Sequence, residues 1–201
     1  RIVGGMTPRC PQGAEEFYPT FVNGELQLTD AVTAEMAKLV ENSYRDVNIA
    51  FANELSMLAE HLGADPFEVI ALANRHPRVN VLTPGPGVGG HCISVDPWFL
   101  VHAAPHHTPL IRTAREVNNK KPAHVVAQIE AVIKQHAVKT VGCLGLAYKA
   151  DVDDLRESPS LEIVRELRHH GSAEILACEP YVSSATFSEF PLQDLAEVLE
   201  R

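Results

Sequence analysis

The chain has 201 residues, a mass of 22.0 kDa and 45% apolar residues, which suffices for one large domain or two small ones with a real core and argues against disorder. Its net charge of -9, without a basic run, argues against binding to nucleic acid. No apolar stretch approaches the ~20 residues needed to cross a bilayer, and the amino terminus lacks the layout of a signal peptide. We therefore expect a soluble, cytoplasmic protein that does not bind a membrane. Four widely spaced cysteines without a CxxC pair indicate neither a disulfide framework nor a structural zinc site.

The first segment, residues 1–28, has the pattern of a β-α-β unit. Ile2-Val3 is a short strand signal whose partners we expect to lie upstream. A helix is expected within Ala14–Val22, and Glu25–Leu28 alternates like a strand after an Asn-Gly turn. About thirty residues of this kind cannot bury a core alone, so we expect the segment to be the remnant of a preceding domain that the chain lacks.

A very long helix follows. Thr29 or Asp30 can cap its amino end, and neither Pro nor Gly interrupts the sequence before Gly63. Its large apolar residues recur every three or four positions, which favours a helix with an apolar face. Two compatible interpretations remain open: a helix that spans the core of a helical domain, and the seam of a homodimer.

A second helix and a glycine-rich stretch come next. Asp65 can cap, and Pro66 can open, a helix that should run to about Asn74. The stretch 77–97 then loses all periodicity, and four glycines and two prolines crowd between positions 84 and 90. Its amides can come close to a ligand, unless the stretch is only a tight turn.

The last part of the chain reads as a parallel β-α-β unit. A buried strand is expected over 140–146, a helix over 158–169 that Gly171 closes, and a second buried strand over 174–178. Only two glycines, Gly142 and Gly145, stand where dinucleotide-binding units have GxGxxG. We therefore do not expect a dinucleotide pyrophosphate to bind there in the usual way.

These patterns predict an α/β chain in three parts. A β-α-β remnant (1–28) precedes a central all-helical domain (29–120), in which further helices begin after Pro97 and at Pro109. An incomplete Rossmann-like parallel α/β domain (121–201) follows and opens with a helix whose first turn holds Pro122.

Four side chains are candidates for chemistry. Cys92 follows the glycine-rich stretch and precedes a helical segment, where free amides and a helix amino end stabilise a thiolate, and Asp96 lies one turn later. Lys38 and Asn42 are four residues apart on the long helix, so both can donate to one oxygen that carries developing negative charge. The alternatives are an inert packed cysteine and a solvated helix face.

Three runs of residues, in this order, resemble the nucleotide-sugar dehydrogenases of the UDP-glucose/GDP-mannose class. They are AEMAKLVEN (34–42), GPGVGGHCISVDP (85–97) and GLAYKADVDDLRESP (145–159). The phrase NRHPRVN (74–80), joined to the second run, is similar to the members that act on UDP-N-acetyl-D-mannosamine. Three motifs in register over nearly the whole chain are far more specific than one glycine motif.

The resemblance implies a four-electron oxidation of the primary alcohol of a UDP-sugar to a carboxylate, with two NAD in succession and a bound aldehyde intermediate. By similarity, Cys92 would attack this aldehyde to give a thiohemiacetal, and its oxidation would give a thioester that water hydrolyses. Lys38 and Asn42 would stabilise the oxyanions. Asp96 would orient or deprotonate water and would partner Lys38.

The resemblance also implies ligand contacts. They are Val88, Gly89 and Gly90 around the sugar, His76 and Arg78 on the nucleotide sugar of a neighbouring subunit, Tyr148 and Lys149 on the substrate, and Arg156 on NAD. A tight turn, an ordinary surface arginine at Arg78 and simple packing of Tyr148 are the alternatives. The acidic residues at 151, 153 and 154 are expected to form a solvated turn.

The class implies an NAD-binding domain before Arg1 and further strands after Arg201. We therefore expect this chain to fold and to form a homodimer through the long helix, but not to turn over substrate by itself. The alternative from another class is a non-catalytic module for oligomerisation and nucleotide binding, with Cys92 incidental. A metal site that joins Cys92 to nearby histidines fits no common ligand spacing.

Overall fold

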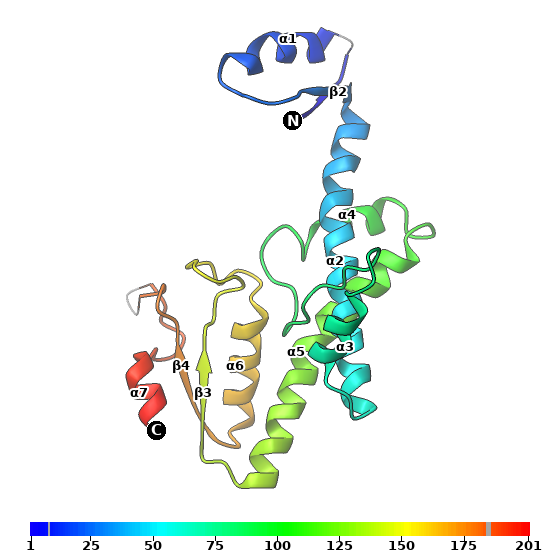
Figure 1. Cartoon of the computed structure of the whole chain (residues 1–201). Helices are drawn as coiled ribbons and strands as arrows, with labels where there is room; N and C mark the ends of the chain where they lie inside the picture. Colours follow the sequence, from blue (N-terminus) through cyan, green and yellow to red (C-terminus); the bar gives the residue numbers. More distant parts are fainter. Residues whose placement is uncertain (8, 184–185) are drawn as a thin grey trace.

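Figure 1 shows the computed structural model of the chain, which describes residues 1–7, 9–183 and 186–201. A small α/β unit sits at the amino end of the long helix α2 (Ala31–His61), and shorter helices surround the rest of α2. A second long helix, α5 (Pro109–His136), packs against α2 and leads to another α/β unit at the carboxyl end.

The amino-terminal unit is a β-α-β arrangement, as its pattern predicts. Strand β1 (Ile2–Gly5) pairs in parallel with β2 (Gln27–Asp30). Ile2-Val3, whose partners we expected upstream, therefore has a partner strand later in the chain. Helix α1 (Arg9–Phe17) and the 3-10 turn η1 (Tyr18–Thr20) connect the two strands. The helix expected within 14–22 is present but begins and ends earlier, and the 3-10 turn covers residues 18–20. Pro11 occupies the first turn of α1, where a missing amide hydrogen costs nothing.

Helices α2 and α3 have the predicted bounds. The Asp30 side chain accepts a hydrogen bond from the Thr33 amide at the amino end of α2. Helix α3 (Pro66–Ala73) begins after Asp65, whose carboxylate accepts from the Phe67 and Glu68 amides. Both caps satisfy amides that have no partner inside the helix, which fixes where each helix starts.

The glycine-rich segment ends at helix α4 (Asp96–Ala103), after which α5 runs without a break to His136. The prediction of a new helix at Pro122 was wrong, because Pro122 lies buried inside α5. Proline in a helix interior removes one hydrogen bond and crowds the preceding turn, so tertiary packing must compensate. The expected boundary at residue 120 consequently falls within a continuous helix.

The carboxyl-terminal unit is the predicted parallel β-α-β. Strand β3 (Thr140–Leu144) pairs in parallel with β4 (Glu174–Cys178), and α6 (Pro159–His170) connects them. Gly171 closes α6 in the left-handed conformation, and a short helix, α7 (Leu195–Glu200), packs on both strands. The core of this unit consists of Val126, Leu146, Leu161, Ile163, Val164, Leu167, Ile175, Ala177 and Phe190.

None of the helices in the described ranges is both long and apolar enough to cross a membrane.

Candidate active site

Cys92 lies at the surface at the amino end of α4. Its carbonyl accepts hydrogen bonds from the amides of Val95 (3.1 Å) and Asp96 (2.7 Å), so the residue closes a turn that leads directly into the helix. The Cys92 side chain is exposed, and its sulfur takes part in no hydrogen bond with the residues that the structure describes. A free, exposed thiol at this position is open to a ligand.

Asp96 joins α4 to α2. Its Oδ2 accepts a hydrogen bond from Asn42 Nδ2 at 2.5 Å. This contact leaves the second hydrogen of the Asn42 amide available, because an amide nitrogen carries two donors. Three of the sequence-predicted residues, Asn42, Cys92 and Asp96, are therefore brought together from two separate runs of the chain.

Lys38 lies one turn before Asn42, but it does not pair with Asp96 as the sequence suggested. Its Nζ is 3.3 Å from Glu41 Oε2, and both side chains are 63% exposed. Glu41 is three residues away on the same helix, whereas Asp96 is already bonded to Asn42. An exposed pair of this kind is weak, so the ammonium can leave Glu41 for a ligand at small cost.

The glycine-rich segment packs against the third run of the family motif. A Cβ placed on Gly89 would lie 2.5 Å from Tyr148 Cβ and 2.6 Å from the Glu157 carbonyl oxygen. Gly90 has a φ of +81°, faces the Tyr148 ring and donates its amide to the Arg156 carbonyl at 3.1 Å. The glycines are thus required by the close approach of Tyr148, which gives that ring a packing role beside Cys92.

Arg156 lies beside the same loop and is held by Asp154. The guanidinium donates from Nε to Oδ1 (2.9 Å) and from a terminal nitrogen to Oδ2 (2.7 Å), and the arginine side chain stays 64% exposed. These charge-assisted hydrogen bonds lower the pKa of Asp154 to about 2 and raise the pKa of Arg156. Asp151 and Asp153 are exposed, as expected of a solvated turn, and Asp151 accepts from the Tyr181 hydroxyl at 3.0 Å. Asp154 is half-buried and bonded to Arg156, which the sequence did not predict.

Lys149 is exposed at the mouth of a cavity of about 510 Å³ at the carboxyl ends of β3 and β4. Ligands of open parallel sheets bind at this edge, where the strands and the following turns leave a crevice. The cavity is lined, among others, by Gly145, Ala147, Cys178, Glu179 and Tyr181.

His76 and Arg78 occupy the exposed turn after α3. The Arg78 amide donates to His76 Nδ1 at 3.3 Å. The Asn74 side chain stabilises the turn, because its Nδ2 donates to the Val81 carbonyl and its Oδ1 accepts from the Val81 amide. Neither side chain contacts Cys92 within the described part of this chain. Both remain exposed and able to reach another molecule.

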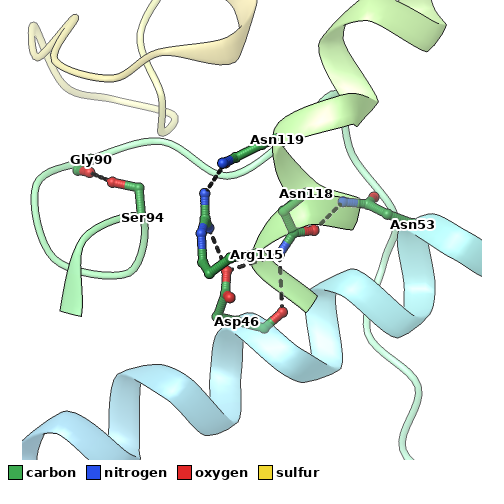
Figure 2. A network of polar contacts seen from close by, with 7 residues as sticks. All are labelled: Asp46, Asn53, Gly90, Ser94, Arg115, Asn118 and Asn119. Atoms are coloured by element: carbon green, nitrogen blue, oxygen red, sulfur yellow. Dashed lines mark hydrogen bonds and ion pairs between the residues drawn. The ribbon is translucent and has the colours of Figure 1, made fainter. Parts of the chain in front are cut away.

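A buried polar network, which the sequence did not predict, joins α2 to α5 (Figure 2). Asp46 Oδ1 on α2 accepts from Arg115 (2.6 Å) and Asn118 (2.8 Å) on α5. Asn118 Oδ1 accepts from Asn53, whose own oxygen accepts the Gly85 amide at 2.9 Å. The network therefore ties both long helices to the start of the glycine-rich segment. The one available sign was the spacing of Asp46 and Asn53, which lie seven residues apart and therefore on the same face of α2.

Nowhere in residues 1–7, 9–183 and 186–201 do three or more His, Cys, Asp or Glu side chains cluster in a way that could hold a metal ion.

Comparison with known proteins gives the family of the chain. The central-domain model of the UDP-glucose/GDP-mannose dehydrogenase family matches residues 32–120, and the UDP-binding-domain model of the same family matches residues 142–201. An NDP-N-acetyl-D-galactosaminuronic acid dehydrogenase of Ralstonia solanacearum is 56% identical over 182 residues, which cover 90% of this chain and 43% of the relative. A UDP-N-acetyl-D-mannosamine dehydrogenase of Campylobacter jejuni is 56% identical over 182 residues, 90% of this chain and 45% of the relative.

A solved structure of the UDP-N-acetyl-mannosamine dehydrogenase Cap5O from Staphylococcus aureus superimposes with a TM-score of 0.85 and 47% identity, over 94% of this chain and 46% of that one. The chain thus spans less than half the length of the relatives that it matches. Two domain models in series, together with relatives that are more than half identical, show that the chain belongs to the UDP-glucose/GDP-mannose dehydrogenase family.

Proposed function

We propose that this chain carries the catalytic cysteine and the UDP-sugar-binding part of an NAD-dependent dehydrogenase that oxidises a UDP-N-acetylhexosamine to its uronate. Two relatives of equal identity are named for an N-acetylgalactosamine and an N-acetylmannosamine derivative, so both support an N-acetylated sugar. The Cap5O structure and the run Asn74–Asn80 favour UDP-N-acetyl-D-mannosamine.

The observation that carries this proposal is the arrangement around Cys92. An exposed thiol stands at the amino end of α4, and the same helix presents Asp96, which is bonded to Asn42 on α2. A nucleophile, a carboxylate and an amide donor therefore meet at one place on the surface. This combination is what acyl chemistry at a carbonyl carbon requires.

The proposed role of Cys92 is to capture the aldehyde and to release the acid. NAD⁺, when bound, would take up one hydride in each of the two oxidations. The Cys92 thiolate forms a C–S bond to the aldehyde carbon while the carbonyl electron pair moves to oxygen, giving a thiohemiacetal alkoxide; the second oxidation leaves a thioester. Water adds to that thioester as Asp96 takes its proton, and the C–S bond then breaks with its electron pair on sulfur.

Lys38 and Asn42 are assigned to the oxygen that becomes negative in these steps. The free amide hydrogen of Asn42 and the Lys38 ammonium can donate to one oxyanion from the same face of α2. Each such donor is worth roughly 3 kcal/mol in the transition state.

The β3–α6–β4 unit does not fit a dinucleotide in the usual way, because the amides of Leu146 and Ala147, shortly after β3, are bonded to the chain's own Glu179. The residue that we assign to NAD is Arg156, whose exposed guanidinium has donors beyond those that Asp154 uses. Val88, Gly89, Gly90, Tyr148 and Lys149 are assigned to the UDP-sugar. We therefore expect this chain to bind UDP-sugar weakly and to produce no steady NADH.

We also propose that a second copy of the chain covers α2. The exposed side chains Val32, Met36, Val40, Tyr44, Phe51, Leu58 and Leu62 follow one another at intervals of four or seven residues, which places them on one side of the helix. An exposed apolar stripe of this length is typical of an interface. His76 and Arg78, exposed and without contact to Cys92 of their own chain, are assigned to the nucleotide sugar of the second copy.

Calorimetry tests the proposal directly. The chain is titrated in turn with UDP, UDP-N-acetyl-D-mannosamine, UDP-N-acetyl-D-galactosamine, GDP-mannose and NAD. We expect both UDP-N-acetylhexosamines to bind, the mannosamine derivative more tightly, with no measurable heat from GDP-mannose or NAD. Binding of NAD alone, or equal binding of GDP-mannose, would contradict the proposal. Binding of UDP that is unaffected by any sugar favours the non-catalytic nucleotide-binding module.

A further inference from the structure

A buried carboxylate that the proposed chemistry does not use follows strand β4. Glu179 is 6% exposed. Its Oε2 accepts hydrogen bonds from the amides of Leu146 (2.7 Å) and Ala147 (2.9 Å), and its Oε1 accepts from the Tyr181 amide (3.2 Å). A charge buried to this degree is tolerated only when such donors replace water, so these bonds are a condition of its burial.

The amides of Leu146 and Ala147 lie where a β-α-β unit commonly binds a phosphate group. In a parallel β-α-β unit, the backbone amides just after the first strand and the amino end of the following helix together form the usual site for a phosphate group. Here the amides of Leu146 and Ala147 hold Glu179 instead. Ser158 caps α6 and also donates to the Leu146 carbonyl, so the helix end is tied to the same turn. The chain's own groups thus fill the phosphate position.

The turn that Glu179 holds carries two proposed substrate residues. Tyr148 follows Ala147 directly and packs against Gly89 and Gly90, two residues before Cys92. Lys149 and Glu179 line the same cavity at the strand ends. The far end of the turn is held by the Tyr181 hydroxyl, which donates to Asp151. The segment after β4 therefore fixes the turn at both ends.

We propose that Glu179 is a positioning residue of the UDP-sugar site: its carboxylate acts as an internal anion that locks the turn bearing Tyr148 and Lys149 against the glycine-rich segment. This inference rests on the proposed function, since it requires a UDP-sugar site at the turn. Glu179 itself touches no substrate and acts through Tyr148 and Lys149. Because the Glu179 carboxylate takes the amides of Leu146 and Ala147, this turn does not offer them to a pyrophosphate, as a GxGxxG turn would.

The test compares four variants of this chain. Glu179→Ala removes the anion and leaves space, Glu179→Leu removes it and fills the space, and Glu179→Gln keeps an oxygen for two amides but turns a donor toward the Tyr181 amide. Ile175→Val, at the opposite end of β4, is the control for a small loss of stability in the same unit. The readouts are UDP affinity by calorimetry, with and without added acetate, and amide hydrogen exchange at residues 146 and 147.

We expect Glu179→Ala and Glu179→Leu to weaken UDP binding by about tenfold, which corresponds to the loss of about 1.4 kcal/mol, with a smaller loss in Glu179→Gln. Exchange at both amides should accelerate by a similar factor. Acetate should restore much of the affinity of Glu179→Ala but none of that of Glu179→Leu, whereas Ile175→Val should keep the affinity of the parent. If Glu179 only stabilised the fold, acetate would not restore UDP affinity in Glu179→Ala while failing to restore it in Glu179→Leu.

Two results would overturn the inference: UDP affinity within about twofold of the parent in Glu179→Ala, or unchanged exchange at both amides, since neither fits a tenfold effect. Absence of UDP binding in the unaltered chain would contradict the proposed function itself. In that case the amide exchange at residues 146 and 147 still tests Glu179: faster exchange in Glu179→Ala supports its hold on the turn, and unchanged exchange contradicts it.

Discussion

Gly89 shows at the scale of one residue why the motif around Cys92 is rich in glycine. A methyl group there would meet the backbone oxygen of Glu157 and the Cβ of Tyr148, neither of which can move alone. We predict that Gly89→Ala lowers the free energy of unfolding by about 1–3 kcal/mol through overpacking. Urea denaturation measures the change. Gly85→Ala, in the same segment but with open space around it, should change stability by less than about 0.5 kcal/mol. Equal effects of the two substitutions would contradict this reason for the glycine.

The ion pair of Asp154 with Arg156 makes the stability of one turn depend on pH. Arg156 lowers the pKa of Asp154 from an ordinary value of 3.8 to about 2. A carboxylate with a lowered pKa contributes stability above its unfolded pKa and loses it as the pH falls toward the folded value. We therefore predict that the turn at 151–156 keeps this stabilisation above the ordinary pKa of 3.8 and loses it progressively as the pH falls from there to about 2. Carboxyl-detected NMR titration should give Asp154 a midpoint near 2, and Arg156→Gln should return it toward 3.8. A midpoint near 3.8 in the parent would refute the pairing.

At the scale of elements, the buried network between α2 and α5 carries the largest predicted effect. Asp46 and Arg115 are almost fully inaccessible and are joined at 2.6 Å. Asp46→Ala leaves the arginine charge buried without its partner, so we predict a loss of about 3–5 kcal/mol in the free energy of unfolding. The double variant Asp46→Leu/Arg115→Met should lose clearly less, because no charge remains buried. Thermal and urea unfolding of the three proteins measure the difference, and an equal loss in single and double variants would count against the ion pair as its cause.

Element ends were predictable where a local signal acts alone. The caps at Asp30, Asp65 and Ser158 fixed the starts of α2, α3 and α6, because a side-chain oxygen and the amides it serves lie within three residues. Pro122 misled the prediction because its local preference was outweighed by packing between helices that are distant in sequence.

In the candidate site, too, local signals were predictable and long-range contacts were not. Cys92, Asp96 and Asn42 could be named because family motifs carry them. The hydrogen bond of 2.5 Å from Asn42 on α2 to Asp96 on α4 could not be derived from spacing. The partners of Glu179 and Asp46 lie 33 and 69 residues away, so local patterns do not show which groups these carboxylates contact. An acidic residue at the end of a buried strand was the one available sign of Glu179.

For the whole molecule, the apolar stripe on α2 predicts the oligomeric state. Phe51 lies in the middle of the stripe and is 53% exposed. We predict that the chain sediments as a dimer and that Phe51→Glu shifts it to monomer without loss of helical content, because a charge in an apolar interface is left unpaired. Arg45→Glu, exposed on another side of the same helix, is the charge-changing control and should leave the dimer intact. A parent chain that sediments as a monomer at high concentration would refute the second copy.

The central claim is that Cys92 is the nucleophile that faces the bound sugar. Its most direct test is alkylation by iodoacetamide at neutral pH, read residue by residue by mass spectrometry, with and without UDP-N-acetyl-D-mannosamine. Cys10 is a stringent internal comparison, since it is also exposed and a hydrogen bond with the Thr7 hydroxyl lowers its pKa, whereas burial raises the pKa of Cys143 and Cys178. We predict rapid labelling of Cys92 that the UDP-sugar suppresses, while labelling of Cys10 is unchanged. Labelling of Cys92 that is slow, or that saturating UDP-sugar leaves untouched, would contradict it.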